Sequence, residues 1–244
     1  MSQLLVTMLI GFFVGIIGTG IGGLMVLALP SQSVKKQSLL LGGSGGIMIA
    51  VVIWDLWPEA SHLHRLSAVG GLLTGALFVL LAGLLMKMKS KGFINRFTRT
   101  GILMGMGIGM HNFPEGLAVG TVRTVADKWQ EWAGLAGLMA AHNVPEGMVV
   151  AATLRLGKVR VQKVLLALLL VELPMGIGAL FGGIIGQFSH RFVASALGFA
   201  AGAMALLVGK EMIPMGNELS SGKMTWAGFL LGIGVGFVLT RVIR

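Results

Sequence analysis

The sequence contains no cysteine and few charged residues. The absence of cysteine among the 244 residues excludes disulfide bonds, thiolate metal ligands and cysteine catalysis. Charged residues make up 11% of the chain and hydrophobic residues 55%, as in an integral membrane protein rather than a soluble domain. The alternation of polar and apolar residues typical of β-strands is also lacking, and the apolar runs are as long as helices. We therefore predict an all-α integral membrane protein.

Acidic residues are much rarer than basic ones, nine against 19, so the formal net charge is +10. Such a charge could indicate nucleic-acid binding. The basic residues, however, lie mainly in short connections between apolar segments, where they are expected to set orientation and meet anionic lipid headgroups. We expect membrane lipids as partners and no nucleic acid.

Eight apolar segments are long enough to cross a bilayer and would form one transmembrane domain over residues 1–244. They lie at about 4–29, 39–58, 67–86, 101–123, 132–154, 164–186, 192–213 and 225–241. No basic residue precedes the first, which we interpret as a span rather than a signal peptide. The connections after the odd-numbered spans carry 12 basic residues, against six on the other side. This bias places the odd-numbered connections in the cytoplasm and both termini outside.

A six-residue motif occurs twice within these spans. It reads His-Asn-Phe-Pro-Glu-Gly at 111–116 and His-Asn-Val-Pro-Glu-Gly at 142–147. On an α-helix its His, Asn and Glu share one face, because they occupy positions i, i+1 and i+4. The proline removes one backbone hydrogen bond and should kink each helix.

Imidazole, carboxylate and amide groups suit a divalent transition metal. Two facing helices would supply His111, Asn112, Glu115, His142, Asn143 and Glu146. A buried His–Glu pair could instead only link helices. The second copy at membrane depth favours the metal site, because ionisable groups there are usually functional.

A weaker repeat appears when the chain is shifted by 156 residues. The shift pairs Gly42 with Gly198, Gly46 with Gly202, Asp55 with Glu211, and Pro58 with Pro214. The two spans involved would cross the membrane in opposite directions. The pattern therefore predicts a 3+2+3 inverted repeat, with the fourth and fifth helices between the halves, as is common in secondary transporters.

Other ionisable residues lie at three depths in the membrane, one near the outside, one in the middle and one near the inside. Such an arrangement suits a cation that passes through. These residues are Asp55, Glu59, His62 and His64 near the outer end of the second span, Glu172 in the sixth, and Glu211 near the inner end of the seventh. Ordinary interfacial polarity remains an alternative for Glu59, His62 and His64. For Glu172 and Glu211 the alternative is a structural ion pair or interhelical hydrogen bond.

Glycine is abundant, with 39 residues, and many have the small-xxx-small spacing of close helix contacts. We predict such contacts at Gly42/Gly46, Gly71/Gly75, Gly101/Gly105/Gly109, Gly198/Gly202 and Gly228/Gly232/Gly236.

Paired H-N-x-P-E-G motifs in the fourth and fifth of eight helices resemble the ZIP family of divalent metal transporters, especially its bacterial, GufA-like branch. The resemblance covers essentially the whole chain. It implies a binuclear metal centre in mid-membrane, with one ion among His111, Glu115, His142 and Glu146. The second ion would lie among Asn112, Glu115, Asn143, Glu146 and Glu172, with the motif glutamates bridging.

The family's usual substrate is Zn²⁺, with Fe²⁺, Mn²⁺ and Cd²⁺ as companions, moved toward the cytoplasm. The resemblance thus implies a multi-pass protein of the bacterial inner membrane that is not an enzyme. Many relatives carry a His-rich loop between the third and fourth spans, whereas residues 87–100 here contain no histidine. An intramembrane metallohydrolase and a non-conducting metal receptor are the alternatives. The sequence leaves open whether the chain forms a homodimer.

Overall fold

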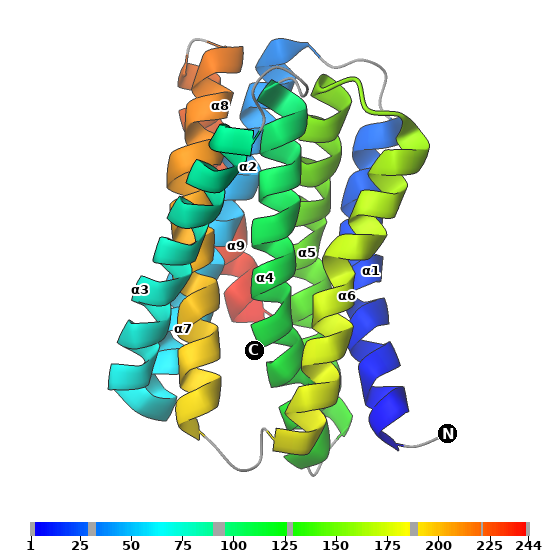
Figure 1. The fold of residues 1–244 in the computed structure, drawn as a ribbon, viewed down its shortest axis with the longest axis vertical. Coiled ribbons are helices and arrows are strands. Elements are labelled where there is room, and N and C mark those ends of the chain that lie inside the picture. Colours follow the sequence, from blue (N-terminus) through cyan, green and yellow to red (C-terminus); the bar gives the residue numbers. More distant parts are fainter. Residues whose placement is uncertain are drawn as a thin grey trace.

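The computed structural model describes residues 3–28, 33–89, 96–125, 129–185, 190–220 and 222–242. Its elements in these ranges are all helical. The α-helices are α1 (Gln3–Ala28), α2 (Val34–Val51), α3 (Trp57–Lys89), α4 (Arg96–Val125), α5 (Trp129–Leu156), α6 (Val161–Ile185), α7 (His190–Leu207), α8 (Ile213–Leu219) and α9 (Lys223–Val242). The long helices run side by side along the long axis of the molecule (Figure 1). The prediction of an all-helical protein is confirmed.

Within the described ranges, five helical stretches are long and apolar enough to cross a membrane. They are Gln3–Ala28, Val34–Leu85, Val161–Ile184, His190–Leu219 and Lys223–Arg241. Helices α4 and α5, which carry the two polar motifs, are 30 and 28 residues long and fall outside this set. The chain thus has the apolar helices of a multi-pass membrane protein.

Two π-helical turns interrupt the helices at related places. One, η1, covers Val52–Leu56 between α2 and α3, and the other, η2, covers Val208–Met212 between α7 and α8. They lie 156 residues apart, which is the offset of the predicted repeat. In each, the residue before a proline donates its N–H five residues back, from Trp57 to Val52 and from Ile213 to Val208. Because the following proline has no N–H, the α-helical ladder cannot continue unchanged there.

The predicted connection between the second and third spans is helical on both sides of one residue. His64 has extended backbone angles, φ −166° and ψ 103°, and divides α3 into two stretches. The Ser67 N–H donates to His64 Nδ1 at 3.2 Å. The imidazole therefore accepts a hydrogen bond from the first turn of the second stretch, whose N–H groups lack helical partners.

Two helix pairs, α2 with α9 and α3 with α7, make equivalent contacts through glycine. A Cβ atom on Gly42 or Gly46 would overlap a carbonyl oxygen of α9, and one on Gly198 or Gly202 would overlap a carbonyl oxygen of α3. The partners in α9 are Thr225 and Phe229, and those in α3 are Ala68 and Leu72. Glycine thus allows the backbones to touch, and the predicted contacts at these positions are confirmed.

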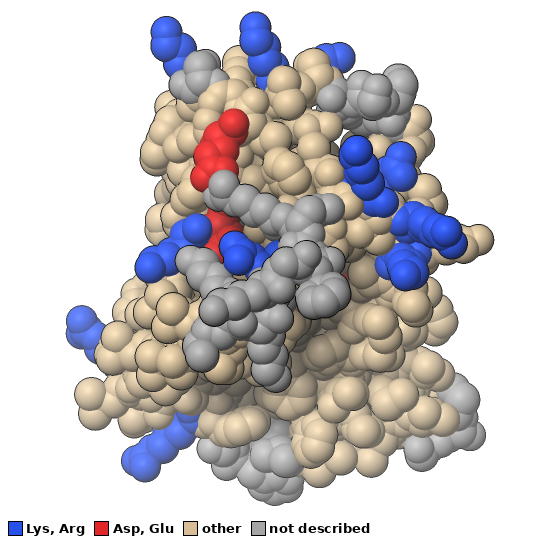
Figure 2. Space-filling view, turned by 45° about the horizontal axis from the view of Figure 1, so that its top comes forward, with Lys and Arg blue, Asp and Glu red and all other residues tan. Residues whose placement is uncertain are grey.

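Helices α1, α4, α5 and α6 pack together beside the group of α2, α3, α7 and α9. Figure 1 shows α1 and α6 along one side of α5, and α3 and α7 at the opposite side of the molecule. Lys and Arg side chains gather toward the end where α2, α4, α6 and α9 begin (Figure 2). We call this the basic end. It matches the clustering predicted for the connections after odd-numbered spans.

Candidate metal site

Five described amide and carboxylate side chains from three helices are completely buried inside the bundle. They are Asn112 and Glu115 of α4, Asn143 and Glu146 of α5, and Glu172 of α6, each with 0% exposure. Burying amide and carboxylate groups away from water is costly unless they find partners. This group therefore calls for a functional explanation.

Hydrogen bonds join this group across helices. The Asn112 amide Nδ2 donates to Glu172 Oε1 and to the Val171 carbonyl oxygen, both at 3.1 Å. The Asn143 amide Nδ2 points to the Met175 sulfur at 3.8 Å. Both asparagines therefore use their donor side on α6, which leaves their acceptor oxygens for another group.

Several buried oxygens find no hydrogen-bond donor among the described residues. They include Oδ1 of Asn112, Oδ1 of Asn143 and Oε2 of Glu172. In addition, Glu172 interacts electrostatically with Glu146 and Glu115, which carry charge of the same sign when ionised. Buried acceptors and repelling carboxylates are both stabilised by a cation, and oxygen ligands of this kind bind divalent metals.

The histidines of the motifs belong to α4 and α5, but the side chains of His111 and His142 lie outside the described residues. Among the described side chains, no three His, Asp or Glu residues are close enough to hold one ion by themselves. The described part of the site therefore contributes amide and carboxylate oxygens only, and the imidazole ligands remain a prediction.

Helix α1 contributes residues that the sequence did not single out. A Cβ on Gly15 would overlap Oε2 of Glu172, so the absence of a side chain there makes room for the carboxylate. Thr19 is 1% exposed, lies beside the same carboxylate, and donates its hydroxyl to the Gly15 carbonyl at 3.0 Å. Met175 lies one turn beyond Glu172 on α6, a spacing that could have indicated its place in the site.

The final glycine of each motif has a packing role. A Cβ on Gly116 would overlap the Met175 carbonyl oxygen of α6, and one on Gly147 would overlap the Thr19 carbonyl oxygen of α1. Met175 and Thr19 are 156 residues apart. The first motif therefore packs against α6 and the second against α1 through equivalent contacts. These contacts bring the asparagines and glutamates of both motifs close to the residues of α6 and α1.

The other predicted path residues belong to elements other than α4, α5 and α6. Asp55 is buried within η1, whereas Glu59 and His62 are exposed on α3, and His64 accepts the Ser67 hydrogen bond. Glu211 is half-buried in η2 and lines a narrow pocket between α3, α4 and α7 with Phe78, Leu103 and Leu207. That pocket holds about 10 Å³, room for a single water molecule.

Known proteins resemble the chain along most of its length. It is 29% identical over 240 residues to "Zinc transporter GufA" of Myxococcus xanthus, with 92% of each chain covered. It is 27% identical over 242 residues to "Zinc transporter ZupT" of Enterobacter sp. (strain 638), with 89% of each covered. No protein-family model matches the chain. This chain is a homologue of ZIP-family metal transporters.

The resemblance to this ZIP branch is therefore confirmed, and its bacterial members are named as transporters rather than enzymes. A zinc-transporter relative from Arabidopsis thaliana is 28% identical over 178 residues, but this chain spans only 29% of that longer protein. The matches to the bacterial relatives, by contrast, cover most of both chains.

Proposed function

We propose that the protein carries divalent transition-metal cations across a membrane, with Zn²⁺ as the preferred substrate. The observation that carries this proposal is the buried group of asparagine and glutamate side chains from α4, α5 and α6, whose oxygens meet inside an apolar bundle. The names of its ZIP homologues support zinc as the substrate.

The proposed centre holds two ions near the middle of the membrane. One ion binds His111, Glu115, His142 and Glu146, and the second binds the two asparagines, both motif glutamates and Glu172. The donor-free oxygens of Asn112, Asn143 and Glu172 support the second set. These ligands also lie near the middle of their helices, as a site at the membrane midplane requires.

We further propose that two inverted halves alternate access to this centre and move the ion toward the cytoplasm. The equivalent glycine contacts and the two π-helical turns, all related by about 156 residues, support the 3+2+3 arrangement. Asp55 and Glu59 serve the outer opening and Glu211 the inner one. The basic end then faces the cytoplasm of a bacterial cell and both termini lie outside.

Uptake of metal into sealed, metal-free vesicles containing the purified protein tests this function. We expect Zn²⁺ to accumulate, with competition from Fe²⁺, Mn²⁺ and Cd²⁺, and we expect Glu146→Gln to abolish accumulation. Glu218→Gln, an exposed change on α8, is the matched control and should transport normally. Tight zinc binding without accumulation would instead identify a non-conducting receptor.

A further inference from the structure

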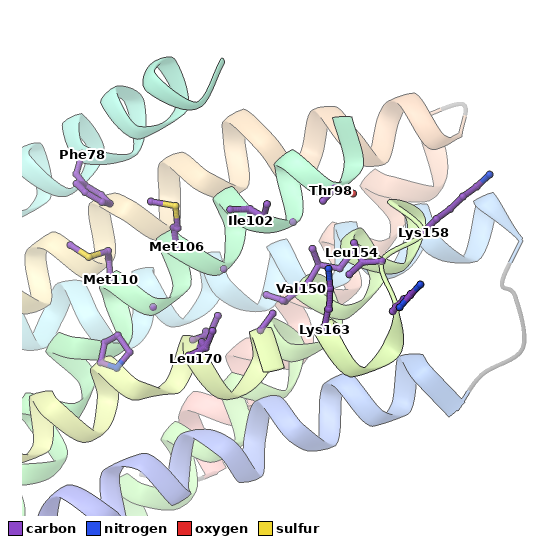
Figure 3. A pocket seen from close by; sticks show the side chains of 18 residues that line it. Phe78, Thr98, Ile102, Met106, Met110, Val150, Leu154, Lys158, Lys163 and Leu170 are labelled. Atoms are coloured by element: carbon purple, nitrogen blue, oxygen red, sulfur yellow. The ribbon is translucent and has the colours of Figure 1, made fainter. Parts of the chain in front are cut away.

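A large cleft lies between α4 and α6, on the side of these two helices that faces α3. Its volume is about 920 Å³, and Phe78 of α3, Val150 of α5 and the turn at 158–160 complete its wall (Figure 3). Met106, Met110 and Leu170 line it and are 41–53% exposed. The cleft therefore opens sideways, onto the surface that meets lipid chains.

Glycines on α4 explain why this cleft exists. A Cβ on Gly116 or Gly120 would overlap carbonyl oxygens of α6, so the two helices touch there. A Cβ on Gly105 would meet Val171 at 3.3 Å, and one on Gly109 would come no closer than 3.5 Å to any atom. At Gly105 and Gly109, helix α4 therefore still contacts Val171 of α6, but less closely than at Gly116 and Gly120. The helices separate toward the basic end, and these glycines widen the gap.

Three cations stand at the basic end of the cleft. Lys158, Arg160 and Lys163 line it and are exposed, and no acidic residue is among its described lining residues. Lys163 lies in the first turn of α6. The turn that carries Lys158 and Arg160 is held in place by two hydrogen bonds: the Thr98 hydroxyl donates to the Gly157 carbonyl at 3.2 Å, and the Val159 N–H donates to the Leu154 carbonyl at 3.0 Å. The cationic end is thus fixed by hydrogen bonds within the protein.

The length of the cleft matches one leaflet of a bilayer. On α4 its lining runs from Thr98 to Met110, a helical rise of about 18 Å. The hydrocarbon core of one leaflet is about 15 Å deep. A ligand with its charge at the cations would therefore extend an apolar chain to the depth of Met110 and Pro174, beside the first motif.

We propose that this cleft binds an anionic phospholipid of the leaflet at the basic end. Its phosphate lies among Lys158, Arg160 and Lys163, and one acyl chain occupies the apolar groove over Gly105 and Gly109. Clustered cations beside transmembrane helices attract anionic headgroups. The same cations repel a divalent metal, and the described lining offers it no carboxylate, so this cleft is not the path of the transported ion.

Retention of lipid on the purified full-length chain, measured by native mass spectrometry, tests the proposal. We expect phosphatidylglycerol to remain bound in preference to phosphatidylcholine. Replacing Lys158, Arg160 and Lys163 together by Gln should remove that preference. Each lost charge should lower the affinity for phosphatidylglycerol by about fivefold. The matched control replaces Lys35, Lys36 and Lys223 by Gln, three cations at the same end outside the cleft, and should keep it.

A second pair of variants tests the acyl-chain groove. Gly105→Leu fills the cleft, whereas Gly234→Leu on α9 places the same side chain where no atom lies within 4 Å. A phosphatidylglycerol carrying a photoreactive group in its tail should label the Met106–Met110 segment in the native chain and in Gly234→Leu, but not in Gly105→Leu. Equal retention of both lipids, or a triple variant that retains phosphatidylglycerol fully, would overturn the proposal. Displacement of the lipid by millimolar glycerol phosphate would also overturn it, because the site would then recognise a free phosphate.

Discussion

At the scale of single residues, Gly15 decides where the Glu172 carboxylate can lie. A Cβ at this position would overlap Glu172 Oε2 and come within 2.9 Å of the Met175 sulfur. Both are ends of flexible side chains, so the fold can accommodate the change while the carboxylate moves. Binding should therefore be more sensitive than stability to this substitution.

We predict that Gly15→Ala lowers zinc affinity by at least about tenfold, or 1.4 kcal/mol. Gly20→Ala, on the same helix with no atom within 4 Å of the added methyl, should leave affinity unchanged. Titration calorimetry measures the affinity, and thermal unfolding in detergent verifies that both variants are folded. Equal zinc affinity in the two variants would show that Glu172 is not a ligand.

The sequence predicts the buried side chains of the site better than their surroundings. Asn112, Glu115, Asn143 and Glu146 can be recognised because the motif is repeated and helical spacing puts its polar groups on one face. Gly15 and Thr19 could not be recognised, because their role depends on how closely α1 approaches α6. That distance is set by tertiary packing rather than by local sequence.

At the scale of helices, close packing depends on which face of a helix a glycine occupies. Gly70 and Gly71 are neighbours on α3, yet only a Cβ on Gly71 would overlap α7, at the Ser195 carbonyl oxygen. Backbone atoms cannot move aside as a flexible side chain can.

Gly71→Ala should destabilise the protein by about 1–3 kcal/mol through overpacking. Gly70→Ala should be neutral or stabilise by up to about 1 kcal/mol, because alanine favours the helix. Unfolding in detergent, followed by helical circular dichroism, compares the two free energies. If both variants are equally stable, α3 and α7 are not in backbone contact.

The two π-helical turns place one acid each, Asp55 and Glu211, at matching points of η1 and η2. If these acids serve the two openings of the path, Asp55→Asn and Glu211→Gln should slow zinc uptake. Equilibrium affinity should stay within about tenfold, because the ligands of α4 and α5 remain. Stopped-flow measurements give the uptake rate, and calorimetry gives the equilibrium affinity. An unchanged uptake rate in both variants would show that these acids do not serve the path.

The repeat of an acid followed by a proline could be predicted from the sequence, but its consequence for the helix could not. Replacement of the α-helical ladder by a π-turn depends on the backbone around Pro58 and Pro214. Likewise, the hydrogen bond that His64 accepts follows from a local break in α3 that apolar patterning does not reveal.

At the scale of the whole molecule, the proposed inverted arrangement fixes which residues face which side of the membrane. The chain has no cysteine, so single cysteines report accessibility without background. We predict that an impermeant thiol reagent labels Glu59→Cys only from outside and Glu211→Cys only from the cytoplasmic side. Labelling of both from the same side would contradict the proposed topology.

The helical class and the approximate positions of the helices could be predicted, because apolar length and the absence of strand patterning determine them. The cleft between α4 and α6 could not be predicted from the sequence. The spacing of Gly105 and Gly109 is the same as that of closely packed glycines, and only the wider separation of α4 from α6 distinguishes them.

The central claim is that oxygen-bearing side chains of α4, α5 and α6 hold the transported ion, and zinc-binding stoichiometry tests it most directly. Calorimetry on the purified native chain should give two equivalents of Zn²⁺ per chain. Glu115→Ala and Glu146→Ala should abolish high-affinity binding, whereas Asn112→Ala and Asn143→Ala should weaken one equivalent only. A single equivalent in the native chain would contradict the two-ion centre. Two equivalents that persist in Glu115→Ala and Glu146→Ala would place the ions elsewhere in the molecule.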